Sequence, residues 1–148
     1  MKYLVKQKSI DIDARDNQGC TPLILAAVHN NSNSVGILLK GGASVWKCDK
    51  QRQNVLHKAA KEGNKDVVEA VRDFCQKDES EGKRTMKALM TLPDFGGNTP
   101  LMLALDSVIT GDTLECLLDI NATLNLGLIE RVNHMGETPM HRACRYYI

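Results

Sequence analysis

Residues 16–27 read Asp16-Asn17-Gln18-Gly19-Cys20-Thr21-Pro22-Leu23-Ile24-Leu25-Ala26-Ala27, and this stretch decides the fold. Gly19 suits the positive φ of a tight turn, because it has no Cβ. The Thr21 hydroxyl can accept hydrogen bonds from the first free N–H groups of a helix, and Pro22 suits the first helical position. The stretch therefore predicts a turn followed by a helix that begins at Pro22.

The same pattern returns 33 residues later, where Asp49, Leu56, Ala59 and Ala60 occupy the positions of Asp16, Leu23, Ala26 and Ala27. Two more copies follow at wider spacing. They read Gly97-Asn98-Thr99-Pro100-Leu101 and Gly136-Glu137-Thr138-Pro139-Met140-His141. Four such openings indicate a repeat protein.

A turn followed by Thr-Pro-Leu-His-x-Ala, at a period of 33, resembles the ankyrin repeat. The later Leu38-Leu39-x-x-Gly42-Ala43 agrees with this resemblance, which extends over essentially the whole chain. It implies an all-α solenoid of stacked antiparallel helix pairs, joined by β-turn hairpin loops. It says little about function, because proteins that share this scaffold differ in their partners.

The repeats divide the chain, which we expect to be a single domain over 1–148, into five segments. Residues 1–15 read as the second half of a repeat, and residues 16–48 as a regular repeat. A repeat with an insertion follows over 49–93, a third repeat over 94–132, and an incomplete one over 133–148. A half repeat at each end suggests a fragment of a longer array, or end helices that lie against something else.

The apolar spacing predicts helices over 22–29, 34–40, 65–75, 85–90, 100–106 and 113–119. In the first repeat the core side chains should be Leu23, Ala26, Ala27, Val35, Leu38 and Leu39. Gly41-Gly42 should end the second helix with a left-handed residue. The apolar residues 126–130 should pack against the array.

The second repeat departs furthest from the pattern. Arg52 replaces the turn glycine, at a cost of about 1 kcal/mol or more, while Asn54 can still cap the next helix. Asp49 and Asp94 are separated by twelve residues more than the 33-residue period allows. The intervening segment includes the hydrophilic residues 76–84. We expect a solvated loop there; a loop that contacts a partner is the alternative.

Composition excludes several classes of function. A formal net charge of +1 gives no general attraction to nucleic acid or to an anionic membrane. No apolar run reaches the roughly 18 residues that span a bilayer, so this segment should not insert into a membrane. The five cysteines, which form no Cys-x-x-Cys pair, fit a reducing compartment, so we expect a cytoplasmic location or the cytoplasmic side of a membrane protein.

No residue pattern indicates catalysis, a cofactor or a metal. The sequence has neither a Gly-x-Ser-x-Gly elbow nor a phosphate-binding glycine-rich loop, so we expect a protein that is not an enzyme. His57 and His141 occupy the His of the repeat motif, where the resemblance implies a structural hydrogen bond to a neighbouring turn. His141 and Cys144 alone do not make a metal site, because a second ligand pair is missing.

We therefore expect the chain to bind another protein, of unknown identity, through the concave face made by turn tips and first helices. By resemblance, its contact positions are Asn17, Gln18, Cys20, Val28, His29, Lys50, Gln51, Gln53, Lys61, Glu62, Phe95, Asn98, Asp106, His134, Met135 and Glu137. Phe95 is either an exposed binding anchor or a turn residue folded onto Gly96, and Trp46 is either a packing residue or an anchor.

Two interpretations of the whole chain remain. The first is a soluble adaptor without catalytic activity. In the second, the chain is a piece of a membrane protein, because its first two repeats and the long segment before Asp94 are similar to the cytoplasmic arrays of transient receptor potential ankyrin-type channels. The cysteines would then be candidates for electrophile or redox sensing.

Overall fold

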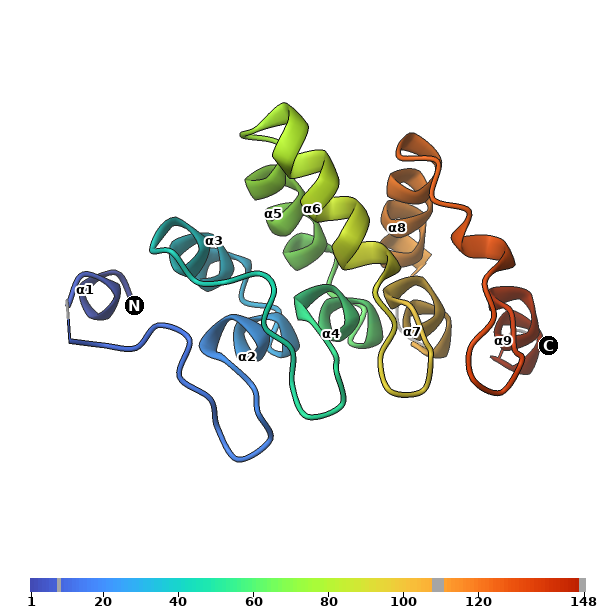
Figure 1. Ribbon diagram of the computed structural model, residues 1–148, viewed down its shortest axis with the longest axis horizontal. Helices are drawn as coiled ribbons and strands as arrows, with labels where there is room; N and C mark the ends of the chain where they lie inside the picture. Colours follow the sequence, from blue (N-terminus) through green and yellow to red (C-terminus); the bar gives the residue numbers. More distant parts are fainter. Residues whose placement is uncertain (8, 108–110, 147–148) are drawn as a thin grey trace.

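The protein forms a row of stacked helix pairs (Figure 1). The computed structural model describes residues 1–7, 9–107 and 111–146. The described helices are α1 (Lys2–Val5), α2 (Pro22–Val28), α3 (Ser32–Lys40), α4 (Val55–Lys61), α5 (Lys65–Cys75), α6 (Glu79–Thr91), α7 (Pro100–Asp106), α8 (Gly111–Thr123), the 3-10 helix η1 (Leu128–Glu130) and α9 (Pro139–Tyr146). The described residues contain no β-strand.

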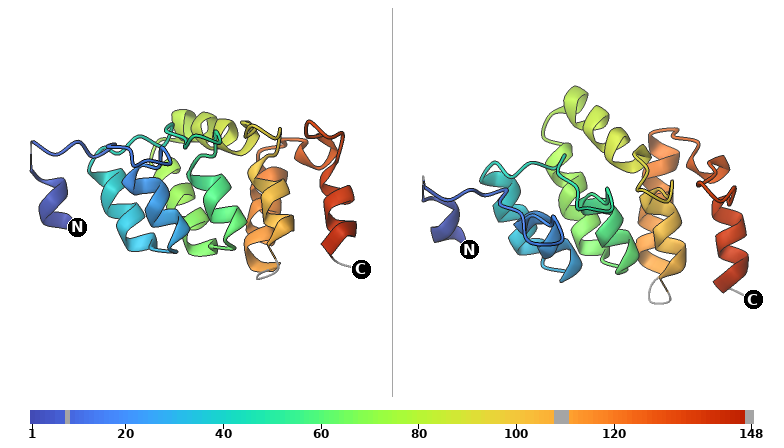
Figure 2. Two further views of the ribbon diagram at one scale, coloured as in Figure 1. Left: turned by 90° about the horizontal axis from the view of Figure 1, so that it is seen from below. Right: turned by 60° about the horizontal axis from the view of Figure 1, so that its bottom comes forward.

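The helices form two rows. The first helices of the repeats, α2, α4, α7 and α9, lie side by side, and each packs against the next. The second helices, α3, α5 and α8, form a parallel row against them, in which α5 contacts both α3 and α8. The turns before α2, α4, α7 and α9 project together from one side of the array (Figures 1 and 2).

The sequence signals that predicted the first helices act as expected. The Thr21 and Thr99 hydroxyls accept N–H hydrogen bonds of 3.4 Å from the third residue after each, and proline occupies the first helical position in both cases. Asn54 replaces this threonine in the second repeat and accepts N–H bonds of 3.0 Å from Leu56 and His57. The His57 ring completes a capping box, because its Nδ1 accepts the Asn54 N–H.

The core runs between the two rows. All six side chains expected in the core of the first repeat are buried, and in the second repeat Leu56, Ala59, Ala60 and Val71 are inaccessible to solvent. Alanines on α2 and α4 are buried against neighbouring helices, so these helices approach closely. The predicted left-handed residue after α3 is Gly42, with φ of 94°.

Two of the second helices, α3 and α8, are longer than the sequence predicted, whereas α5 has the predicted bounds. Helix α3 begins at Ser32, because the Asn31 side chain caps it with a 3.0 Å bond from Ser34 N. Helix α8 extends to Thr123. The segment after it packs as expected: Leu126 and Leu128 are buried, and the Asn121 Oδ1 accepts the Leu128 N–H at 3.0 Å.

The prediction of a solvated loop over residues 76–84 is wrong. These residues turn and then form the first half of α6, which extends through the helix predicted over 85–90. The Asp78 carboxylate caps α6 by accepting N–H bonds of 3.1 Å from Ser80 and Glu81. Thr85, Met86, Leu89 and Met90 lie on the buried face of α6, whose axis crosses those of the other helices (Figure 2).

Candidate protein-binding surface

The four turn tips share one hydrogen-bonded shape. In each, the first side chain accepts two backbone N–H bonds, from the residues two and four positions later, at 2.8 to 2.9 Å. The accepting residues are Asp16, Asp49, Asp94 and Asn133. These three carboxylates and the Asn133 amide oxygen are therefore used by the turns, and the side chains one to three positions later form the outer surface. We call residues 16–20, 49–53, 94–98 and 133–137 together the hairpin face.

Backbone hydrogen bonds hold adjacent tips in register. The N–H groups of Lys50, Phe95 and His134 donate to carbonyl oxygens of the preceding tip, at 3.1, 3.0 and 3.0 Å. The acceptors are Gln18, Gln51 and Gly96. Equivalent positions of successive repeats therefore lie side by side, which makes the hairpin face a continuous surface.

Buried side-chain contacts stabilise the second and third tips. The Asp49 carboxylate pairs with the Lys58 ammonium at 2.7 Å, and the Asp94 carboxylate accepts a 3.1 Å bond from the Gln53 side chain. Burial alone raises the pKa of Asp94, but hydrogen bonds from Asn98 and Gln53 outweigh it and hold the pKa below its ordinary value. Asp94 is therefore a structural anion of the turn.

His57 links the second repeat to the third, as the resemblance implied. Its ring is fully buried, and Nε2 lies 3.1 Å from the Asn98 carbonyl oxygen. Since Nδ1 accepts the Asn54 N–H, Nε2 is the protonated nitrogen and donates to Asn98. Burial lowers the pKa of His57, which favours this neutral ring. His141, at the same motif position, is exposed, and its Nδ1 bonds only to Thr138 of its own turn.

Phe95 is the most prominent aromatic side chain of the hairpin face. It is 62% exposed, which excludes a ring folded away against the turn. The Arg52 guanidinium lies 5.8 Å from the centre of the Phe95 ring, within the range of a cation–π contact. Arg52 has φ of 61°, as expected for a side chain that replaces a turn glycine. Arg52 is not among the contact positions predicted from the sequence, although its place at a left-handed turn residue is a usable signal.

The structure places the predicted contact positions in three groups. Cys20 and Gln53 are buried, at 7% and 5% exposure, so their side chains are not on the surface. Val28, Asn98, Asp106 and Glu137 are partly buried. The exposed positions are Asn17, Gln18, His29, Lys50, Gln51, Lys61, Glu62, Phe95, His134 and Met135.

The exposed positions do not form one patch. Asn17, Gln18, Lys50, Gln51, Phe95, His134 and Met135 belong to the hairpin face. His29, Lys61 and Glu62 lie at the opposite ends of α2 and α4. A seven-residue helix is about 10 Å long, so a ligand must extend along the helices to contact both groups.

Ion pairs fix the last described helix against the third repeat. Arg142, itself buried, pairs with Asp106 and with Glu137, and Arg145 also pairs with Glu137. Burial raises the pKa of Asp106, although Arg142 acts in the opposite direction. Three of the predicted contact positions near this end are therefore also structural, namely Asp106, Glu137 and, through its bond from Asn133, Asn98.

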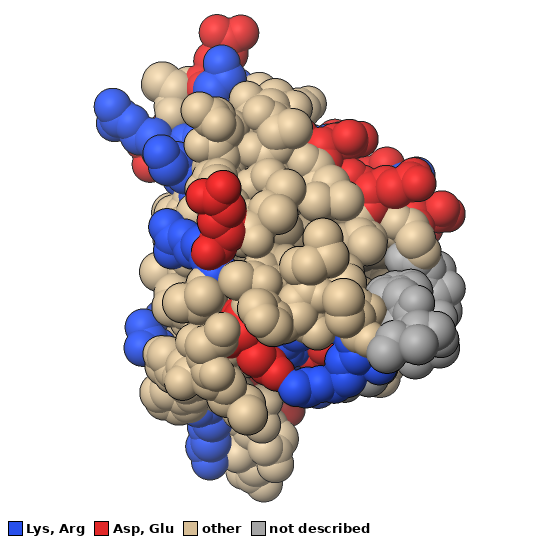
Figure 3. All heavy atoms as spheres, turned by 90° about the vertical axis from the view of Figure 1, so that its right-hand side faces the viewer, with Lys and Arg blue, Asp and Glu red and all other residues tan. Residues whose placement is uncertain are grey.

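The end of the array formed by α9 is largely uncharged. Figure 3 shows a broad area without charged side chains between basic groups on the left and acidic groups at the upper right. Among the apolar side chains of this part of the chain, Met135, Met140 and Val132 are all more than half exposed. The fourth tip therefore adds apolar surface beside Phe95. Trp46, before the second tip, is 51% exposed, so half of its indole is available to a partner.

The cysteines fall into two classes. Cys20, Cys75 and Cys116, here called the buried thiols, have pKa values raised by burial, to about 11 for Cys75. Cys48 is half-buried and Cys144 is exposed. Within the described ranges, no three His, Cys, Asp or Glu side chains lie together as a metal site would need, and no helix is long and apolar enough to cross a membrane.

Comparison with known proteins agrees with this architecture. A family model described as the ankyrin repeat matches residues 18–50. The chain is also similar to transient receptor potential cation channel subfamily A member 1 of Homo sapiens, with 32% identity over 107 residues. That match covers 72% of this chain but only 9% of the human protein.

Proposed function

This chain is built of ankyrin repeats, and from that premise we propose that it is a non-catalytic module that binds another protein through its hairpin face. The observation that carries the proposal is the exposed Phe95 ring beneath the Arg52 guanidinium, at the centre of a row of aligned tips. Exposed aromatic and arginine side chains are the residue types that most often dominate binding energy at protein interfaces.

The charges of the hairpin face indicate the type of partner. The carboxylates of its turns are engaged by turn N–H groups, whereas Lys50 and Arg52 are exposed. The hairpin face thus presents amides, two cations and the apolar side chains of Phe95 and Met135. We infer a protein partner with an apolar side chain among acidic ones, met in the cytoplasm or at the cytoplasmic side of a membrane. A nucleic acid is disfavoured by the near-zero net charge.

A comparison of single variants tests this proposal. The wild-type chain, Phe95→Ala, Lys50→Ala and Met140→Ala are immobilised separately, and the proteins retained from the source cells are quantified by mass spectrometry. Met140, at 65% exposure, is a matched control because it is as exposed as Phe95 but lies on α9, outside the hairpin face. We expect Phe95→Ala and Lys50→Ala to lose the same proteins, and Met140→Ala to keep them. All variants should melt within a few degrees of wild type, because these side chains are exposed.

If Phe95→Ala and Met140→Ala retain the same proteins as wild type, the hairpin face is not the binding surface. If Phe95→Ala loses binding and also shows a large fall in melting temperature, that variant is misfolded. Binding by folded Lys50→Ala then shows whether the hairpin face is the binding surface.

The likeness to the human channel favours a second proposal, in which this chain is part of the cytoplasmic ankyrin array of a related membrane protein. An antibody against residues 76–84, which form an exposed part of the turn and α6, distinguishes the two. A band near 16.4 kDa in the soluble fraction supports a free adaptor, and a much larger band in the membrane fraction supports the array. In that setting, Cys48 and Cys144 are the candidates for cysteine-based sensing, since the buried thiols are protonated and enclosed.

A further inference from the structure

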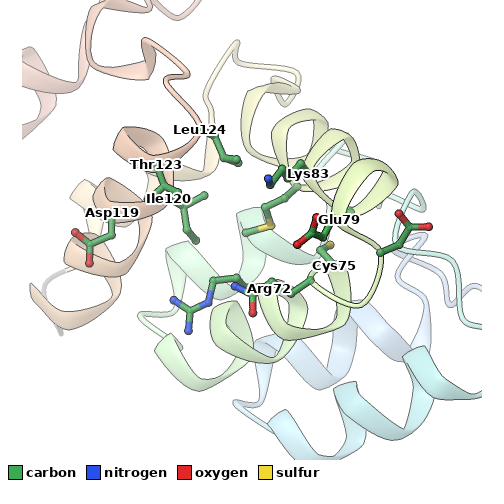
Figure 4. A pocket seen from close by; sticks show the side chains of 12 residues that line it. Arg72, Cys75, Glu79, Lys83, Asp119, Ile120, Thr123 and Leu124 are labelled. Carbon is green, nitrogen blue, oxygen red and sulfur yellow. The ribbon is translucent and has the colours of Figure 1, made fainter.

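A groove opens between α6 and α8, with α5 as its floor (Figure 4). Its volume is about 480 Å³, within the range of sites that hold small molecules in proteins. The groove exists because α6 packs on α5, and α5 also packs on α8. It lies among the second helices, away from the tips that form the hairpin face (Figure 1).

The walls of the groove carry apolar side chains and Lys83 of α6, and its floor carries Arg72 of α5. Met86 of α6, Ile120 of α8 and Leu124, the residue after α8, line the walls. Figure 4 shows Ile120, Leu124 and Lys83 pointing into the space between the helices, while Arg72 extends across the floor. The arrangement offers an apolar surface beside two positive charges.

The Arg72 guanidinium lacks a good acceptor. Its Nε is buried and has no hydrogen-bond partner among the described residues. Its Nη1 lies 4.0 Å from the Cys116 sulfur, a weak contact, and burial raises the pKa of this thiol, so the sulfur carries no charge. The nearest carboxylate, on Asp73, lies 3.8 Å from Nε, but its side chain is 69% exposed and therefore solvated. Arg72 is thus a partly buried cation whose N–H groups can donate to an anion.

The carboxylates around the groove do not satisfy Arg72. Asp78 caps α6 through the N–H groups of Ser80 and Glu81. Glu79 and Asp119 are exposed, and Figure 4 shows the Asp119 carboxylate pointing away from the groove. Solvent and salt screen exposed charges strongly and partly buried ones much less, so the charge of Arg72 dominates at the floor.

We propose that this groove binds a small amphipathic carboxylate, with its carboxylate group on Arg72 and Lys83 and its apolar body between Met86, Ile120 and Leu124. An arginine fork can donate two parallel N–H bonds to a carboxylate, which would give the Arg72 guanidinium a good acceptor. Met86 and Ile120 are only 4% and 5% exposed, so the apolar body would lie against their edges and mainly against the more accessible Leu124 side chain. This site is separate from the hairpin face, so it does not depend on the function proposed above.

Methyl NMR spectroscopy of the whole chain tests the proposal. The probes are phenylbutyrate and its neutral analogue phenylbutanamide, which differ in charge but hardly in shape. We expect phenylbutyrate to shift the methyl signals of Met86 and Ile120 saturably, and to leave Met135, on the hairpin face, unchanged. The amide should bind about tenfold more weakly, because it cannot form charge-assisted bonds with Arg72.

Two variants test whether Arg72 supplies the positive charge that binds the carboxylate. Arg72→Gln should lower the affinity for phenylbutyrate about tenfold and leave that for the amide unchanged. Lys65→Gln removes an exposed charge from the same helix, outside the groove, and should have no effect. In the wild-type protein, equal affinity for the acid and the amide, or shifts spread over all methyl groups, would overturn the proposal. These two outcomes do not require that Arg72→Gln folds. An unchanged affinity in folded Arg72→Gln would also overturn it.

Discussion

Two glycine-to-alanine substitutions should change the free energy of unfolding in opposite directions. Gly36 and Gly82 both lie inside helices, where alanine is favoured over glycine by about 0.5 to 1 kcal/mol. A Cβ on Gly36 would meet no heavy atom of the described residues within 4 Å, so Gly36→Ala should stabilise the protein by that amount. A Cβ on Gly82 would lie 1.5 Å from the Cys75 carbonyl oxygen, so α6 must move away from α5.

The cost at Gly82 is at the upper end for an overpacked site, about 3 kcal/mol, because a backbone carbonyl cannot rotate away as a side chain can. After the gain in helix propensity, Gly82→Ala should destabilise the protein by about 2 kcal/mol. Urea unfolding followed by far-ultraviolet circular dichroism measures both values. If the two variants are stabilised equally, α6 does not pack on α5 as described, and the groove beside it is lost as well.

Three further predictions concern buried histidine and cysteine side chains. His57→Ala should destabilise the protein by about 3 kcal/mol in urea unfolding, because it leaves the buried Asn54 N–H without an acceptor, removes one of the two bonds that the Asn98 carbonyl accepts, and empties a fully buried site. His141→Ala should cost less than about 1 kcal/mol, because that ring is exposed and bonds only within its own turn. Similar costs for both would show that His57 does not join the repeats. Below its ordinary pKa of 6.5, His57 takes up a proton in the unfolded chain but not in the folded one. Stability should therefore fall as the pH decreases through 6.5 and below, and this slope should be absent in the folded His57→Ala variant. Native labelling with a thiol reagent, read by mass spectrometry, should modify Cys144 and Cys48 first, and rapid modification of the buried thiols would contradict their burial.

The sequence was most informative where local chemistry decides the structure. Pro22 and Pro100 begin their helices as predicted, and the left-handed backbone at Arg52 followed from its place at a turn glycine. Such features depend on a few adjacent residues, so they can be recognised without knowledge of the rest of the fold.

Helix α6, which the sequence did not predict as a whole, shows where prediction from local sequence patterns stops. Residues 76–84 are hydrophilic and contain Gly82, which together indicate a loop. The opposing signals were Asp78 as a cap, Glu79 and Glu81 in the first turn, and an apolar stripe continuing to Met90. Gly82 is explained only by the close approach of α6 to Cys75, a contact between elements that no local pattern reveals.

Two of the predicted contact positions are buried for a similar reason. Gln53 and Cys20 occupy variable positions of the repeat, yet both are buried in this structure. Gln53 is buried because its amide donates to Asp94, the first residue of the next tip, 41 residues later. Whether a turn side chain faces solvent thus depends on the adjacent repeat, which the sequence of one repeat does not contain.

The insertion that forms α6 leaves the hairpin face intact. Although twelve extra residues separate the second and third tips, three contacts still join these repeats: the Phe95 N–H donates to Gln51, the Gln53 amide to Asp94, and the His57 ring to Asn98. The extra length is accommodated entirely among the second helices, where it creates the groove. The hairpin face and the groove can therefore change independently, since no hydrogen bond described here joins the residues of one to those of the other. Phe95→Ala should leave the binding of phenylbutyrate unchanged, and Arg72→Gln should leave protein binding at the hairpin face unchanged; an effect of either variant on the other site would mean that the two surfaces are coupled through α5 and α4.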